Sequence, residues 1–173
     1  MGRLQHARHR RGQRSKEFPE ADKLFALCHG SRNGFEQNYL ATKLNVEVTG
    51  TDISETASQF PRSVQWDFHD ANEQWVGHCH FVYTNSLDQS WNPRQAVSTW
   101  VDQLRPGGIL FIEHTMVHSA EGASEMDPFG ASPSLMPYLL AKWLGHKIAI
   151  EIMKSVKPNN KPEVWLFAVK RVG

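Results

Sequence analysis

The residues best suited to chemistry lie in a glycine-containing turn, CHGSRNG at residues 28–34, and in an acid further along the chain, Asp52. Glycine has no Cβ atom, so a turn that contains it lets the backbone approach a bound molecule closely. A carboxylate is a strong acceptor and can take both hydroxyl groups of a ribose. The turn and the acid together predict a site for a cofactor that contains adenosine.

The segments around the turn are predicted to position it. Residues 23–28 are an apolar run and predict a buried strand. Residues 35–44 predict a helix with apolar residues on one side, and residues 46–51 predict a second strand that leads into Asp52. The order of strand, glycine turn, helix, strand and acid is typical of a nucleotide-type cofactor site.

Strands and helices continue to alternate along the chain. After Asp52 we predict a short helix ended by Pro61 (54–60), a strand (63–68), a polar loop (69–78) and a further strand (79–85). A helix begun by Pro93 (93–104), a break at Pro106-Gly107-Gly108 and a strand (109–114) come next. A long loop (115–134), a helix (135–144) and two strands (146–153 and 163–170) joined by a short polar turn (157–162) complete the predicted elements. Such alternation predicts an α/β fold with a Rossmann-like, doubly wound, mostly parallel sheet. The final pair adds a C-terminal antiparallel hairpin, which makes the sheet seven-stranded.

The composition is that of an ordinary soluble domain. The chain has 173 residues, 40% of them hydrophobic and 21% charged. No apolar run approaches the roughly 20 residues that span a bilayer, and the basic N-terminus lacks the apolar core of a secretion signal. Cys28 and Cys79 both fall in predicted strands, which favours two buried free thiols over a disulfide or a metal pair. We therefore expect a cytoplasmic protein that does not enter a membrane.

The charge is unevenly distributed. Six of the 19 lysines and arginines lie in residues 1–16, where there is no acid, so the remaining 13 face all 18 acidic residues. This predicts a basic, disordered arm at residues 1–17 ahead of one folded domain at residues 18–173. The arm is either a solubilising terminus or a segment that contacts RNA or another polyanion, and it has no interleaved aromatic residues for base stacking.

Two further motifs narrow the class of fold. The sequence LRPGG at residues 104–108 precedes an apolar strand, and NSLDQS at residues 85–90 is followed by a helix that Pro93 begins. Both resemble motifs of the small-molecule type of class I S-adenosylmethionine-dependent methyltransferase, and the terminal hairpin suits that family too. The resemblance covers residues 23–171 and rests on the order and spacing of these motifs together.

The resemblance implies S-adenosylmethionine as the cofactor and gives roles to particular residues. The turn would pass beneath the methionine part, and the other residues would meet the ribose, the adenine and the sulfonium: Gly30, Ser31, Arg32 and Gly34 in the turn, Asp52 at the ribose, Ile53, Asp67 and the backbone of Phe68 at the adenine, and Asn85 near the sulfonium. The chain departs from the family at Cys28, where an acid is usual, at Arg32, where a third glycine is usual, and at Gln89, where a histidine is usual. Arg32 is either a ligand of the methionine carboxylate or a solvated loop residue.

Candidates for acceptor chemistry follow the later predicted strands. Substrates in this type of fold meet the cofactor at the carboxyl ends of the strands, which points to Asp88, Glu113, His114 and His118. A hydroxyl acceptor needs a base, and His114 suits that role because histidine titrates near neutral pH. It is alternatively a hydrogen-bonded histidine at a strand end. The spacing of Glu113, His114 and His118 gives no evidence for a metal, and we predict none.

The sequence thus supports three functions. The first is a methyltransferase that acts on a small molecule, at oxygen, with Trp91 as a residue that stacks on the substrate. The second is a module of the same fold that binds the cofactor weakly or not at all and acts in protein or RNA binding, as the missing acid at Cys28 and the basic arm would suit. The third and weakest is a nicotinamide dehydrogenase. The site is either open, covered by residues 115–134 or covered by a partner chain, so a homodimer is one of the alternatives.

Overall fold

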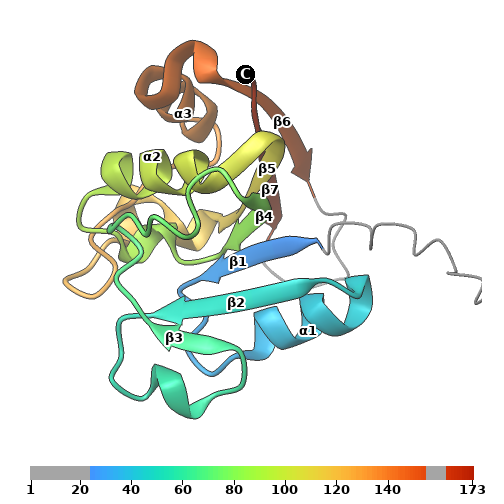
Figure 1. Ribbon diagram of the computed structural model, residues 1–173. Coiled ribbons are helices and arrows are strands. Elements are labelled where there is room, and N and C mark those ends of the chain that lie inside the picture. The colour runs from blue at the N-terminus through green and yellow to red at the C-terminus, as the bar shows by residue number, and fades with distance from the viewer. Residues whose placement is uncertain (1–23, 155–162) are drawn as a thin grey trace, which may run out of the picture.

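The computed structural model describes residues 24–154 and 163–173 (Figure 1). The arm expected at residues 1–17 and the turn expected at residues 157–162 lie outside them. The helices and strands are β1 (Phe25–His29), α1 (Phe35–Leu44), β2 (Glu47–Asp52), β3 (Ser63–Gln65), β4 (Cys79–Thr84), α2 (Pro93–Gln103), β5 (Leu104–Thr115), α3 (Met136–Leu144), β6 (Ile148–Lys154) and β7 (Val164–Arg171).

The seven strands form one sheet in the order β3-β2-β1-β4-β5-β7-β6. The neighbouring strands in the series β3-β2-β1-β4-β5 all pair in parallel, whereas β7 is antiparallel to both β5 and β6. The chain places β2 and then β3 on one side of β1, and β4 and then β5 on its other side. The direction in which strands are added therefore reverses at β1. This is the doubly wound sheet with a terminal hairpin that the alternating pattern predicts, and a ligand is expected at the carboxyl ends of the strands beside the reversal.

Helices cover both faces of the sheet, with α1 on one face and α2 and α3 on the other (Figure 1). The larger core lies under α2 and α3, where Val82, Ile112 and Phe167 of the strands pack with Trp100 and Leu140 of the helices. A smaller cluster lies under α1: Ala26, Cys28, Ala41, Val46 and Val48. Both cysteines are buried free thiols, as expected.

Local sequence accounts for where the first two long helices begin. Gly34 precedes α1 with a φ of 83°, a left-handed conformation that suits glycine. Asn92 caps α2 by accepting a hydrogen bond from the Gln95 backbone N–H, and Pro93 follows it in the first turn. These two helix starts place the glycine turn and the segment after β4 at the same edge of the sheet.

Two predicted elements are wrong. The helix expected at residues 54–60 is reduced to a 3-10 turn, Ala57–Gln59. The Asp52 carboxylate accepts from the Ser54 N–H, and the Ser54 hydroxyl contacts both the N–H and the hydroxyl of Thr56. These local side-chain bonds compete with a helical first turn.

The break expected at Pro106-Gly107-Gly108 is also absent, because β5 starts at Leu104 and runs through it. The register of β4 with β5 shifts between Cys79 and Phe81 at this point. A Cβ atom on Gly108 would lie 2.9 Å from the Cys79 carbonyl oxygen. The small residue therefore permits an irregular strand where composition alone predicts a turn. The same strand is longer than expected, while β3 ends three residues early.

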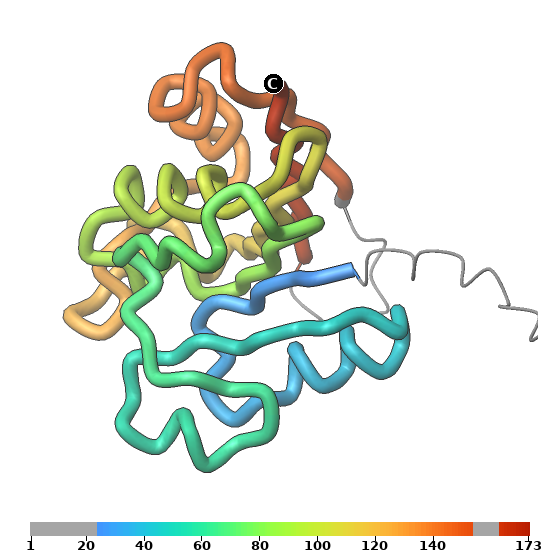
Figure 2. Tube along the Cα trace, in the orientation of Figure 1, coloured from blue at the N-terminus to red at the C-terminus, as the bar shows by residue number. Residues whose placement is uncertain are grey.

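The long segment between β5 and α3 returns past the carboxyl ends of the strands (Figure 2). It contains two 3-10 turns, Met116–His118 and Ala120–Gly122. The Phe129 N–H donates to the Asp88 carbonyl oxygen, and the Ala131 N–H donates to the His118 carbonyl oxygen. This segment is therefore fastened to the loop after β4. In the part of the chain that the structure describes, no helix is long and apolar enough to cross a membrane.

Candidate functional site

A cavity of about 210 Å³ opens at the carboxyl edge of the sheet, where β1, β2 and β3 end. Its lining comes from the glycine turn, the ends of β2 and β3, the loop after β4 and the segment after β5: Gly30, Asp52, Ile53, Trp66, Asp67, Phe68, His69, Gln89, Trp91 and Met126. Five residues expected to bind the cofactor thus meet here, namely Gly30, Asp52, Ile53, Asp67 and Phe68.

Gly30 and Asp52 form the floor of this cavity. Gly30 has a φ of 70°, and a Cβ atom on it would lie 2.5 Å from the Cβ and Oγ of Ser86. Only glycine fits that approach without displacing the segment after β4. The Asp52 carboxylate accepts from the backbone N–H of Arg32 at 2.9 Å and from that of Ser54 at 2.9 Å. These bonds fix its direction, and each oxygen keeps a further lone pair for a ligand hydroxyl.

The other expected residues of the turn do not line the cavity. Ser31 is buried with its Oγ against Gly50, and its N–H donates to the Thr51 carbonyl oxygen. Arg32 is exposed with a φ of 42°, and Gly34 lies at the start of α1. The roles in cofactor binding expected for Ser31, Arg32 and Gly34 remain predictions. They concern the part of the ligand that would lie along the turn.

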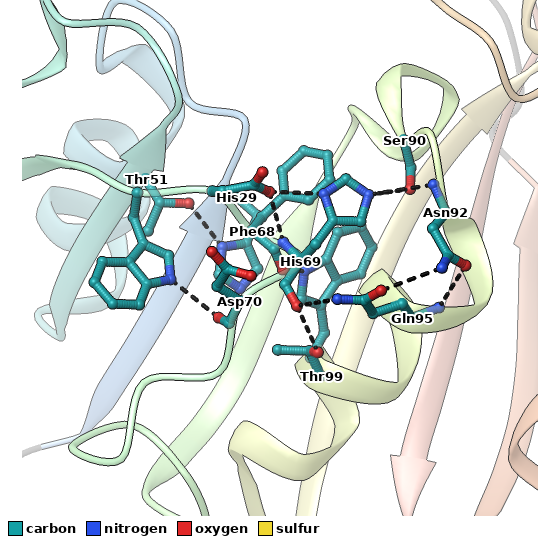
Figure 3. A network of polar contacts seen from close by, with 12 residues as sticks. His29, Thr51, Phe68, His69, Asp70, Ser90, Asn92, Gln95 and Thr99 are labelled. Carbon is teal, nitrogen blue, oxygen red and sulfur yellow. Dashed lines mark hydrogen bonds and ion pairs between the residues drawn. The ribbon is translucent and has the colours of Figure 1, made fainter.

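Asp67 is held by a histidine that sequence reasoning left in a polar loop. Its Oδ1 accepts from the N–H of His69 at 2.9 Å and from His69 Nδ1 at 2.7 Å. The Nε2 of His69 lies 2.7 Å from the Ser90 hydroxyl, so Nδ1 carries the proton and Nε2 accepts (Figure 3). The carbonyl of His69 accepts from Thr99 and Gln95 of α2. His69 is 3% exposed and joins the end of β3 to α2.

Aromatic side chains form the wall of the cavity. The ring of Trp91 lies 4.5 Å from that of His69 and is 63% exposed. Phe68 packs edge-on to Trp100, whose indole N–H donates to the Phe68 carbonyl oxygen. Ile53 stands 70% exposed beside Asp52. The cavity thus combines an apolar wall with a fixed carboxylate, as ligand pockets commonly do.

A second histidine, His29, lies under the turn. It is fully buried, with Nδ1 2.8 Å from the Thr51 hydroxyl, Nε2 2.8 Å from Gln103 Oε1, and its ring stacked on Trp100. Burial lowers the pKa of His29 to about 4, and the hydrogen bond with Gln103 only partly opposes this. No sequence pattern indicates this role, because His29 simply ends an apolar strand.

Asn85 lies at the end of β4 and outside the lining of the cavity. Its Nδ2 donates to Glu36 Oε1 at 3.4 Å, and its Oδ1 accepts from the Ser86 hydroxyl. Glu36 belongs to the first turn of α1. A carboxylate thus stands beside the residue expected near the sulfonium, a neighbour that sequence reasoning did not foresee.

The three candidate catalytic residues, Asp88 after β4, His114 near the end of β5 and His118 after it, lie close together but differ in access. His118 Nε2 lies 3.4 Å from Asp88 Oδ2, and both residues line a second cavity of about 140 Å³ with Asp127. Burial raises the pKa of Asp88, which Asp127 reinforces and His118 opposes. His114 is buried, donates from Nε2 to the Ala131 carbonyl oxygen, and packs edge-on against His118. Burial lowers the pKa of His114.

The two cavities are neighbours along the chain. Asp88 and Asp127 line one, while the adjacent Gln89 and Met126 line the other. His118 is more exposed than the buried His114, and its Nε2 faces the Asp88 carboxylate. Among the described residues, no group of three or more His, Cys, Asp or Glu side chains is arranged to hold a metal ion.

The comparisons with known proteins concern the fold. No family model matches the sequence, and no curated protein matches it. Among solved structures, the chain is similar to the CMeT domain of the citrinin polyketide synthase (TM-score 0.64, 15% identity), where the match covers 87% of this chain and 47% of that one. This chain therefore spans about half the length of that neighbour.

Two further neighbours are closer to it in length. One is the Burkholderia thailandensis 1,6-didemethyltoxoflavin-N1-methyltransferase with bound S-adenosylhomocysteine (TM-score 0.66, 13% identity, 87% of this chain and 72% of that one). The other is a putative methyltransferase from Bacillus halodurans (TM-score 0.67, 12% identity, 87% and 94%). The chain has the fold of class I S-adenosylmethionine-dependent methyltransferases. The fold inferred from residues 85–90 and 104–108 is confirmed, and the activity has to be argued from the residues of this methyltransferase-fold chain.

Proposed function

We propose that this protein is an S-adenosylmethionine-dependent methyltransferase that methylates a small molecule at an oxygen atom. The observation that carries the proposal is the Asp52 carboxylate at the end of β2, fixed by two backbone N–H groups and facing a cavity beside Gly30. Structural neighbours support the choice of cofactor, since one of them holds S-adenosylhomocysteine.

The residues at the cavity fit the adenosine part of this cofactor. Asp52 would accept from the ribose hydroxyls, and Ile53, Phe68 and Trp91 would enclose the adenine. Asp67 keeps its Oδ2 for the adenine amino group, because His69 occupies only Oδ1. Gly30 lets the turn lie close to the segment after β4, because a Cβ atom there would collide with Ser86. The cofactor, when bound, supplies a methyl group on a positively charged sulfur.

The pair of Asp88 and His118 supports oxygen as the acceptor atom. Methyl transfer to a hydroxyl requires a base, whereas a free amine needs none of comparable strength. His118 would take the hydroxyl proton as the oxygen attacks the methyl carbon, and Asp88 would orient the imidazole. His114 would act as a positioning residue, because its Nε2 is committed to a backbone carbonyl.

The test is calorimetric titration with S-adenosylmethionine and S-adenosylhomocysteine. We expect both to bind, and Asp52→Asn to weaken binding by at least about tenfold, because charge-assisted hydrogen bonds to the ribose are lost. Asp102→Asn at the end of α2 is the matched control and should bind as the wild type does. Thermal melts of each variant show that it is folded.

If the wild type binds neither compound, the proposal that this protein is a methyltransferase is refuted. It would favour the second function, a module of the same fold that acts in protein or RNA binding, for which the uncharged Cys28 is the specific observation. If the cofactor binds, a screen of hydroxyl and amine acceptors follows. Activity on amines alone, unchanged in Asp88→Asn, would overturn the assignment of oxygen.

A further inference from the structure

The amino-acid part of the proposed cofactor has to lie outside the cavity. At about 210 Å³, the cavity is smaller than the range of about 300–1,000 Å³ that is usual for ligand pockets. Its lining comes mainly from the ends of β2 and β3, where Asp52 and Asp67 are, and is completed by Gln89 and Trp91 after β4 and by Met126 after β5. Gly30 is the lining residue that belongs to the turn, so the tail of a cofactor whose ribose meets Asp52 would leave the cavity along the turn, toward the ends of β1 and β4.

A carboxylate stands where that tail would arrive. Glu36, in the first turn of α1, accepts a hydrogen bond from Asn85 Nδ2 at 3.4 Å. Asn85 directly follows β4, and β4 pairs with β1 so that Tyr83 lies opposite Cys28. Glu36 is half-buried, so its carboxylate is partly withdrawn from water and yet reachable from the turn.

The other described carboxylates at this edge have different partners. Asp52 and Asp67 belong to the adenosine side, and Asp88 pairs with His118. Glu113 accepts from the Tyr83 hydroxyl at 2.9 Å. Glu36 differs from these carboxylates because its hydrogen-bond partner is the neutral side-chain amide of Asn85.

Cys28, which lies one residue before the end of β1, provides no charge for a cation. It is 1% exposed, and burial raises the pKa of its thiol, with Glu36 adding to the effect. The thiol is therefore neutral, and an ammonium group near it would have no counter-charge from β1 itself.

We infer that Glu36 binds the ammonium group of the methionyl part of the cofactor, with Asn85 orienting its carboxylate. This assignment rests on the proposed function. A carboxylate and an ammonium form a charge-assisted pair that a partly buried position strengthens. Through it, α1 would supply the negative charge that Cys28 lacks.

The experiment compares two ligands and two variants by calorimetry. The ligands are S-adenosylhomocysteine and its analogue in which hydrogen replaces the amino group. The variants are Glu36→Gln, which keeps an acceptor oxygen for Asn85, and the matched control Glu73→Gln, an exposed residue between β3 and β4. The wild type and the control should prefer the natural ligand by about tenfold or more. Glu36→Gln should lose that preference and bind the analogue as the wild type does.

The outcomes separate this inference from the function on which it rests. If the wild type binds S-adenosylhomocysteine and Glu36→Gln keeps the full preference for the amino group, Glu36 is not its ligand while the cofactor site stands. If Glu36→Gln weakens both ligands equally, its role is structural and the inference is wrong. If the wild type binds neither ligand, both proposals fall.

Discussion

Acidification should destabilise this fold through His29. The side chain is fully buried, and burial lowers its pKa to about 4 from the ordinary value of 6.5. The neutral ring is therefore favoured in the native state, and the unfolded chain takes up the proton first. A group of this kind stabilises the fold above about pH 6.5, and that contribution is lost as the pH falls toward about 4.

The magnitude follows from the gap between the two pKa values. Each tenfold change in proton affinity corresponds to about 1.4 kcal/mol, so full protonation of His29 would cost about 3 kcal/mol, most of it by about pH 4.5. This is a large share of the roughly 5–15 kcal/mol that holds a typical domain together. The Thr51 and Gln103 partners cannot offset it, since both already bond the neutral ring.

Urea denaturation of the wild type and His29→Gln, from about pH 7 to about pH 4.5, measures this contribution directly. His29→Gln should start less stable, because Gln cannot stack on Trp100 as the imidazole does. It should then lose about 2–3 kcal/mol less than the wild type over this range. His78→Gln, at an exposed histidine, should follow the wild type. Equal losses in wild type and His29→Gln would refute the reasoning.

Two further variants test the cavity itself. Gly30→Ala should destabilise the fold by about 1–3 kcal/mol in urea and abolish S-adenosylhomocysteine binding, because its Cβ would collide with Ser86 at a positive φ; unchanged stability would contradict the close approach. Trp91→Ala should weaken binding of the same ligand about tenfold, because stacking on the adenine is lost. It should change the free energy of unfolding by less than about 1 kcal/mol, since Trp91 is mostly exposed. Undiminished affinity in calorimetry would show that Trp91 does not contact the adenine.

The local pattern predicts the part of the site that is contiguous in the chain. The strand before Gly30 and the strand that ends at Asp52 follow their apolar patterns, and a helix does form at Phe35–Leu44. Its expected apolar side is wrong, because Phe35, Tyr39 and Leu44 are exposed, whereas Gln37 and Ala41 are the buried residues of α1. Their geometry follows from β–α–β packing, which brings the turn and the acid to one edge. Asp67 likewise follows the next strand. These residues could be placed in advance because each depends on elements only a few residues away.

The rest depends on distant partners that no local pattern contains. His69 resembles a loop residue until Ser90, 21 positions on, brings a hydroxyl to its ring. Glu36 resembles a solvated helix residue until Asn85 lies against it. His114 resembles an exposed base at a strand end, but the segment after β5 folds back and takes its Nε2 with the Ala131 carbonyl.

The histidines under and beside the cavity show why these distant contacts matter for function. His29 ties the end of β1 to Gln103 of α2, and His69 ties the end of β3 to Thr99 of the same helix. The helix therefore braces the two strand ends that present Gly30 and Asp67. The imidazole of His29 is itself part of this brace, because Nδ1 contacts Thr51 and Nε2 contacts Gln103, whereas His69 reaches the helix through its backbone carbonyl. Since burial lowers the pKa of His29, protonation of its ring as the pH falls would weaken the β1 end of the brace and the core beneath the cavity.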